Sequence, residues 1–255
     1  LTGKPLGYWG SQARTEATGY GTVYFVKHLL ADKNDTFEGK KVAVSGSGNV
    51  AIYAMEKATE LGATVITCSD SSGFVYDPEG IDVALVKELK EKNRERISKY
   101  VETRKGATYY DKESVWDFET AYDIALPCAT QNEINEKQAA ILVKNGVKVV
   151  AEGANMPCTL EAVAVFAKSA VIYCPGKAAN AGGVAVSALE MSQNAERLAW
   201  SFEKVDGMLD QIMQNIYETC RDTANEYQAR DNFVLGANIA GFEKVAAAML
   251  SQGLV

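Results

Sequence analysis

The sequence predicts an α/β protein of the Rossmann type: a doubly wound, mostly parallel sheet with helices on both faces, followed by a helical C-terminal tail. Three observations predict it. Short β-branched segments alternate with helical ones over the first two thirds of the chain, a glycine-rich turn joins the first strand to a helix, and no strand is expected after residue 173. Such alternation is typical of a parallel sheet that is covered on both sides.

The first elements form one unit. A helix is expected over residues 15–30, a strand over 41–45, a helix over 50–61 that ends at Gly62, and a second strand over 64–69. The strand, turn, helix and strand together take about 30 residues, which is the size of a βαβ unit. The remaining expected elements are strands over 107–110, 122–126, 148–152 and 171–173, and helices over 83–100, 135–145, 159–168, 184–194, 203–227 and 239–252.

Two parts of the chain are expected: a dinucleotide-binding domain over residues 1–230 and a C-terminal helical segment over residues 231–255. Apolar side chains recur at helical spacing along the last helix. They are Ile239, Phe242, Val245, Ala246, Met249 and Leu250. Because the tail has no sheet of its own, this apolar stripe is expected to pack against another part of the protein.

Composition excludes several classes of function. The net charge of −7 leaves no basic face for nucleic acid or anionic lipid. No uninterrupted apolar run reaches the roughly 18 residues of a membrane span, and residues 1–10 lack the apolar core of a signal peptide. Five cysteines without a C-x-x-C pair, and a single histidine, argue against a metal site and predict reduced, buried thiols in a cytoplasmic protein. His28 is expected to be structural or to lie at the surface, because no acid–base partner is evident.

The turn after the first strand has the spacing of a pyrophosphate-binding loop. Gly46 permits the tight turn, Gly48 lets the backbone approach a phosphate, and Ala51 allows close packing of helix on strand. The helix that follows offers free N–H groups and the positive end of its dipole. The turn therefore predicts dinucleotide binding, with Ser47, Gly48, Asn49 and Val50 as candidate cofactor-binding residues.

The end of the second strand should determine the choice between NAD and NADP. Asp70 there could accept hydrogen bonds from the ribose hydroxyls, which favours NAD. Its serine neighbours, including Ser71, could instead donate to a 2′-phosphate, with Lys90, Lys92 or Arg94 as the basic partner. From these residues alone, both cofactors remain open.

Seven short segments identify a family when they are taken together. They are residues 16–21, 46–51, 127–132, 152–157, 177–184, 190–194 and 236–239. In this order and over essentially the whole chain, the sequence resembles the hexameric glutamate dehydrogenases, in particular the bacterial NADP-dependent type. The resemblance implies reversible oxidative deamination of L-glutamate to 2-oxoglutarate and ammonium with NADP(H), carried out by a homo-hexamer.

The resemblance also implies roles at the nicotinamide end of the cofactor. Thr18 and Asn180 look like the residues that hold the nicotinamide amide. Ala129, Thr130 and Asn155 look like the residues that line the nicotinamide ribose.

Three further residues match the family, one among the cofactor-binding residues and two at the substrate. Arg14 matches an arginine near the cofactor cleft. Val184 and Ser187 look like the residues that meet the far end of the substrate, with Ser187 donating to the side-chain carboxylate. Relatives that act on leucine, valine or phenylalanine have no such carboxylate to bind.

Two small hydroxyl residues resemble the NADP-dependent branch. NAD-dependent bacterial members often carry a bulky aromatic residue at the position of Ser47 and proline at that of Ser71. NADP is therefore the expected cofactor, and Asp70 keeps NAD as the alternative.

The family's catalytic lysine, its proton-shuttling aspartate and two carboxylate-binding lysines lie in glycine-rich segments of an upstream substrate domain. No such segment occurs here, and residues 1–4 resemble the end of that domain. We therefore expect no catalytic residue in this chain, Lys177 in the cleft loop included, and no turnover by the chain alone. The last helix resembles the segment that returns to pack on the substrate domain. The alternatives are the cofactor domain of a branched-chain or aromatic amino-acid dehydrogenase, and a non-catalytic dinucleotide-binding module.

Overall fold

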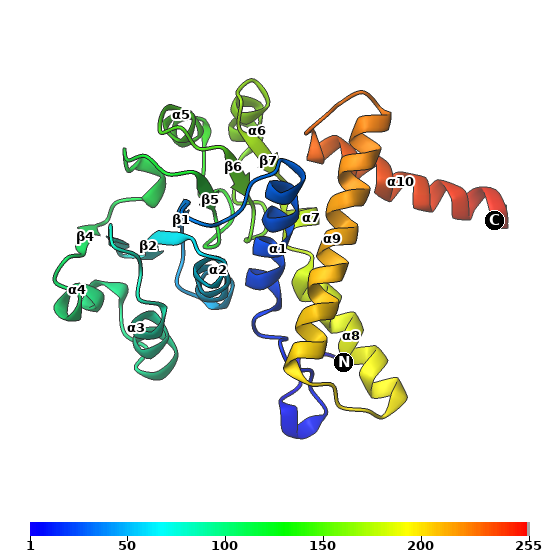
Figure 1. The fold of residues 1–255 in the computed structure, drawn as a ribbon, viewed down its shortest axis with the longest axis horizontal. Coiled ribbons are helices and arrows are strands. Elements are labelled where there is room, and N and C mark those ends of the chain that lie inside the picture. Colours follow the sequence, from blue (N-terminus) through cyan, green and yellow to red (C-terminus); the bar gives the residue numbers. More distant parts are fainter. Residues whose placement is uncertain (254–255) are drawn as a thin grey trace.

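The computed structural model describes residues 1–253, which form a sheet of seven strands in the order β4-β3-β2-β1-β5-β6-β7 (Figure 1). The four pairings from β2 through β1, β5 and β6 to β7 are parallel, whereas β3 pairs antiparallel with both β2 and β4. The predicted Rossmann-like, mostly parallel sheet is thus confirmed. The strands are β1 (Lys41–Val44), β2 (Thr64–Asp70), β3 (Gly73–Tyr76), β4 (Thr108–Asp111), β5 (Ile124–Leu126), β6 (Val149–Ala151) and β7 (Ile172–Cys174).

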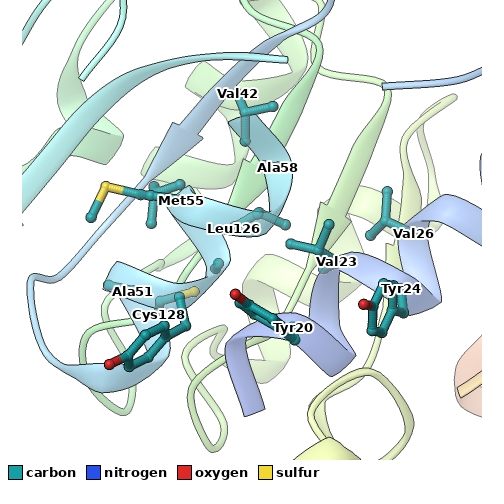
Figure 2. Packing of buried hydrophobic residues seen from close by; sticks show 14 of the residues in the cluster. Tyr20, Val23, Tyr24, Val26, Val42, Ala51, Met55, Ala58, Leu126 and Cys128 are labelled. Atoms are coloured by element: carbon teal, nitrogen blue, oxygen red, sulfur yellow. The ribbon is translucent and has the colours of Figure 1, made fainter. Parts of the chain in front are cut away.

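Helices cover both faces of the sheet. In β1, Val42 and Val44 point into the core on the side of α1 and α2, while Ala43 belongs to the core on the side of α5 and α6. Figure 2 shows α1 and α2 lying side by side over the first of these faces. The helices are α1 (Ala17–Asp32), α2 (Asn49–Glu60), α3 (Val83–Lys87), α4 (Tyr100–Thr103), α5 (Glu136–Lys144), α6 (Leu160–Ala167), α7 (Gly176–Ala179), α8 (Gly182–Glu196), α9 (Phe202–Glu226) and α10 (Phe233–Gln252), with single turns η1 (Leu6–Tyr8), η2 (Glu88–Lys92), η3 (Ile97–Lys99) and η4 (Val115–Asp117).

The segment after β2 differs from the prediction in two ways. Strand β3 was not predicted, and it returns antiparallel to β2 through a tight turn. The helix expected over residues 83–100 is wrong beyond Lys92, because the chain turns at Arg94, whose φ is 55°. The backbone N–H of Ile97 then donates to the Asp70 carboxylate, at 2.9 Å, instead of continuing a helix. This tertiary contact brings the segment back to the end of β2.

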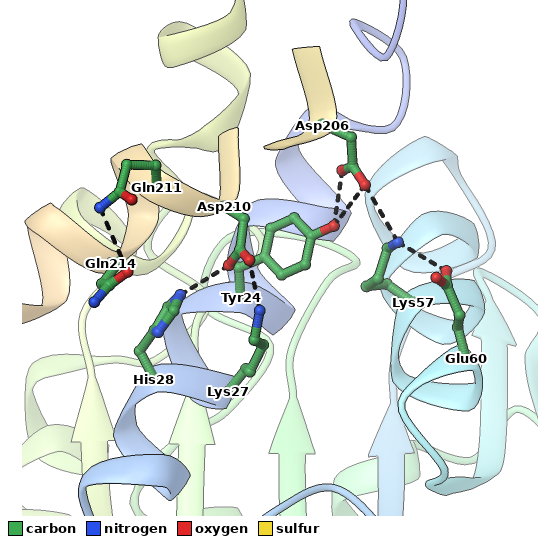
Figure 3. Close-up of polar contacts among 9 residues, drawn as sticks. All are labelled: Tyr24, Lys27, His28, Lys57, Glu60, Asp206, Asp210, Gln211 and Gln214. Carbon is green, nitrogen blue, oxygen red and sulfur yellow. Dashed lines mark hydrogen bonds and ion pairs between the residues drawn. The ribbon is translucent and has the colours of Figure 1, made fainter. Parts of the chain in front are cut away.

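A polar layer joins α9 to α1 and α2 (Figure 3). Lys57, only 4% exposed, lies with its ammonium 4.2 Å from the centre of the Tyr20 ring, 2.7 Å from the Glu60 carboxylate and 3.6 Å from that of Asp206. The Tyr24 hydroxyl donates to the same Asp206 carboxylate. These contacts satisfy a buried cation and fix the helix that follows the phosphate turn.

His28 has a partner that the sequence did not reveal. Its Nε2 lies 2.8 Å from Oδ1 of Asp210 on α9, so the expectation that it lacks an acidic partner is wrong. The pair lies in the α1–α9 contact, which agrees with a structural role. All five cysteines are free and buried, as predicted.

The tail helix α10 begins at Phe233, earlier than the predicted residue 239. Its first turn belongs to the main body: Phe233 is buried, and a Cβ on Gly236 would lie 2.0 Å from the carbonyl oxygen of Cys220. Most of the predicted stripe beyond it is exposed, and α10 projects away from the sheet (Figure 1). Residues 254 and 255 of the predicted tail lie outside the described residues.

By length and composition alone, α10 is also long and apolar enough to cross a membrane. Glu243 and Lys244 interrupt the helix, so it contains no uninterrupted apolar run of that length. One such helix is weak evidence of a span.

Candidate functional site

The candidate site lies where the carboxyl ends of the parallel strands meet. Strand β1 has β2 on one side and β5 on the other, which is the point where strand order reverses and where ligands of such sheets bind. Two adjoining clefts open there, of about 830 and 530 Å³. Val50, Cys128 and Ala129 line both clefts, so together these form one continuous site.

The phosphate turn has the geometry that the sequence predicts. Gly46 adopts a φ of 91°, and its N–H donates to the Ser69 hydroxyl at 2.7 Å. No side chain caps the N-terminus of α2 at Gly48, and a Cβ on Gly48 would meet no atom within 4 Å. The first N–H groups of α2 therefore face open space, which is the cradle that a pyrophosphate requires.

At the end of β2 the carboxylate of Asp70 accepts hydrogen bonds from other residues of the protein. Oδ1 accepts from the N–H and hydroxyl of Ser72 at 2.8 and 2.5 Å, and Oδ2 accepts from the N–H of Ile97. The Lys90 ammonium lies 3.6 Å from Oδ2, and the Asp70 side chain is 7% exposed. Burial raises the pKa of Asp70, but the bonds from Ser72 and Ile97 and the charge of Lys90 outweigh it, so that this pKa is lowered.

Of the serines near the end of β2, Ser71 is the one that faces a basic group. The guanidinium of Arg96 donates to the Ser71 hydroxyl at 2.7 Å. Ser71 and Lys112 line the larger cleft. Arg96 does not line it, and neither do Lys90, Lys92 and Arg94; Arg96 reaches the cleft through its bond to Ser71. Sequence reasoning missed Arg96 and Lys112. Arg96 could not be found without knowing that the chain turns back after residue 92.

The smaller cleft gathers the residues expected at the nicotinamide and substrate ends. The Asn180 side-chain amide donates to the side-chain oxygen of Asn155 at 2.8 Å, so these two residues from separate loops meet. Buried Glu152 joins the same loops, since it accepts from the N–H groups of Cys158 and Gly176. The predicted residues that line this cleft are Arg14, Thr18, Val50, Ala129, Asn155, Asn180, Val184 and Ser187, and Thr130 lines the larger cleft.

Arg14 lines the smaller cleft beside Thr18 and Gly183. Its Nε is buried and has no hydrogen-bond partner within residues 1–253, and an added Cβ on Gly183 would lie 3.8 Å from its Nη1. The same Cβ would lie 2.3 Å from the Thr18 hydroxyl, so Gly183 leaves the room that the Thr18 side chain needs.

The family is decided by comparison with known proteins. A model of the glutamate/leucine/phenylalanine/valine dehydrogenase family matches residues 9–253. The chain belongs to this family. It is 52% identical to the NADP-specific glutamate dehydrogenase of Haemophilus influenzae over 258 residues, which cover the whole chain and 57% of that protein. The NAD(P)-specific glutamate dehydrogenase of Xylanibacter ruminicola is also 52% identical, over 57% of its length.

Solved structures agree with this family assignment. The glutamate dehydrogenase of Plasmodium falciparum superimposes with a TM-score of 0.96 at 46% identity, over the whole chain and 55% of its own. The chain thus spans a little more than half the length of the relatives that it matches.

In this member of the dehydrogenase family Lys177 faces away from the clefts. Its ammonium donates to the side-chain oxygen of Asn238 on α10, and it lines the groove between α9 and α10. This position agrees with the expectation that Lys177 is not the reactive lysine.

Proposed function

We propose that the chain is the NADP(H)-binding part of a glutamate dehydrogenase, which catalyses the reversible oxidative deamination of L-glutamate to 2-oxoglutarate and ammonium. The observation that carries this proposal is the continuous site: an uncapped phosphate turn at one end, and Arg14 with Ser187 at the other. The names of the closely similar relatives point to the same reaction.

The end of β2 supports NADP over NAD. A 2′-phosphate needs a basic group and hydroxyl donors, and Arg96 with Ser71 provides both. The carboxylate of Asp70 would repel that phosphate, but its oxygens are turned inward to Ser72 and Ile97. We propose that Asp70 orients this segment and that Ser71 and Arg96, with Lys112 nearby, bind the phosphate.

The smaller cleft supports a dicarboxylate substrate. A guanidinium that lacks an acidic partner is the group that binds carboxylates most strongly, and Arg14 forms no ion pair within residues 1–253. We propose that Arg14 and Ser187 receive the side-chain carboxylate of glutamate and that Val184 contacts its methylenes. A leucine, valine or phenylalanine side chain would leave Arg14 unpaired, which disfavours the branched-chain and aromatic alternatives.

The proposed role of the chain's own residues is to bind and orient the cofactor. The cofactor, when bound, accepts or supplies a hydride at C4 of its nicotinamide ring. Asn180 and Thr18 would fix the ring amide, and Ala129, Thr130 and Asn155 would hold the neighbouring ribose. We propose that groups outside these 255 residues move the protons, so that this chain binds NADP(H) without turnover.

The experiment that tests the substrate assignment compares two serines of α8 in the complete protein. Ser187 lines the cleft, whereas Ser192 on the same helix is exposed and donates to the carbonyl oxygen of Ala188. Ser187→Ala should raise KM for glutamate about tenfold through loss of a charge-assisted hydrogen bond, and Ser192→Ala should leave it unchanged. Equal activity of wild type and Ser187→Ala on glutamate would overturn the assignment, and preference for an apolar amino acid would favour the alternatives. A cytoplasmic location and a homo-hexamer, both implied by the resemblance, stay predictions.

A further inference from the structure

We propose that Glu133 is a positioning residue, which holds the loop after β5 in the shape needed to bind the nicotinamide ribose. This inference rests on the proposed function and extends it to a residue that lines the larger cleft and that the sequence did not single out. Oε1 of Glu133 accepts from the backbone N–H groups of Ala129 and Thr130, at 3.0 and 3.2 Å. Oε2 accepts from the indole Nε1 of Trp116 at 2.7 Å.

The loop needs such an acceptor because its backbone leaves the sheet at Pro127. The N–H groups of Ala129 and Thr130 have no backbone acceptor among the described residues. A carboxylate offers two oxygens with about four lone-pair sites, and it can therefore accept from both N–H groups and from an indole at once. An amide offers one oxygen and would turn its NH₂ group toward one of these donors.

Trp116 makes this a rigid connection. The indole lies on η4 and is 1% exposed in the core beside α5 and α6. Glu133 thus links a loop at the rim of the cleft to a side chain that the core holds in place. Burial raises the pKa of the Glu133 carboxyl, although bonds from Ser45, Trp116 and the loop N–H groups act in the opposite direction.

The position of the loop decides which half of the cofactor is affected. Ala129 lies where the two clefts join, on the nicotinamide side of the phosphate turn, whereas Ser71 and Arg96 lie at the other end. Loss of the Glu133 contacts should therefore weaken binding of the nicotinamide half and leave the adenosine half unaffected.

The test uses two ligands on the chain as it is: NADPH, and 2′,5′-ADP, which lacks the nicotinamide half. In Glu133→Gln one of the three donors loses its acceptor, and we expect the Kd of NADPH to rise about tenfold. The Kd of 2′,5′-ADP should stay within about twofold of wild type. The control is Glu136→Gln, because Glu136 is exposed on the first turn of α5 and should change neither value.

Each outcome bears on a different claim. An unchanged NADPH affinity of Glu133→Gln would overturn the positioning role. So would equal loss of both ligands, because it would indicate a general loss of fold. Failure of the wild-type chain to bind either ligand would instead overturn the proposed function, on which the role of Glu133 rests.

Discussion

The replacement Asp70→Asn tests whether the Asp70 carboxylate binds the ribose hydroxyls of the cofactor or stabilises the fold. In the structure both oxygens of Asp70 accept hydrogen bonds, from Ser72 and from Ile97, and the side chain is 7% exposed. Asparagine keeps one oxygen and places an NH₂ group against a donor. One buried hydrogen bond to a charged acceptor is lost, which costs about 2 kcal/mol.

Urea unfolding followed by tryptophan fluorescence at pH 7 measures this loss, and thermal unfolding should show a Tm lower by roughly 4–8 °C. Asp111→Asn is the matched control, because Asp111 is exposed at the end of β4. The NADH affinity of Asp70→Asn should stay near wild type under conditions in which it is folded, because both carboxylate oxygens already accept from the protein. Unchanged stability together with a large loss of NADH affinity would refute this account of Asp70.

The pH dependence of Asp70 has a definite sign. Its pKa is lowered in the folded protein, since the bonds from Ser72 and Ile97 and the charge of Lys90 outweigh the opposing effect of burial. The stability that it contributes is therefore fully present above the unfolded pKa of about 3.9, and it is lost as pH falls through the lower, folded pKa. The gap between wild type and Asp70→Asn should be constant from about pH 5 to 8 and should close only in stronger acid.

Three further predictions concern other parts of the chain. Gly153→Ala should weaken NADPH binding more than tenfold. The new Cβ would lie 2.5 Å from the sulfur of Cys128 and 3.1 Å from Cγ1 of Val50, and both of these residues line the site. An affinity equal to that of wild type in a fluorescence titration would contradict this. Arg96→Ala should raise the Kd of NADPH about tenfold and leave that of NADH unchanged; parallel changes for both cofactors would refute the role of Arg96. Glu190→Gln should lower the free energy of unfolding by about 2 kcal/mol without changing NADPH affinity, because the buried Glu190 carboxylate accepts from the N–H groups of Gly3 and Lys4. A urea unfolding curve equal to that of wild type would argue against this.

The N-terminal half of the Rossmann unit could be predicted closely from the sequence. Strand β1, the Gly46 turn and α2 follow from local rules: apolar β-branched residues, glycine where φ is positive, and apolar side chains at helical spacing. The family segments also placed Asn155 and Asn180 in one site, although they lie on separate loops.

The segment between β2 and β4 could not be predicted in the same way. Its residues have a helical pattern up to Lys92, and the turn at Arg94 is set by contacts with Asp70 that are distant in sequence. For the same reason the sequence pointed to Lys90, Lys92 and Arg94 instead of Arg96. Glu133 was missed because its donors belong to a loop and to a core tryptophan, and no spacing rule connects them.

Side-by-side titration of the chain with NADPH and NADH tests the central claim most directly. The uncapped turn at Gly48 predicts that both dinucleotides bind, and the Ser71–Arg96 pair predicts that NADPH binds at least about tenfold more tightly. Equal affinities, or tighter binding of NADH, would contradict the account of this site.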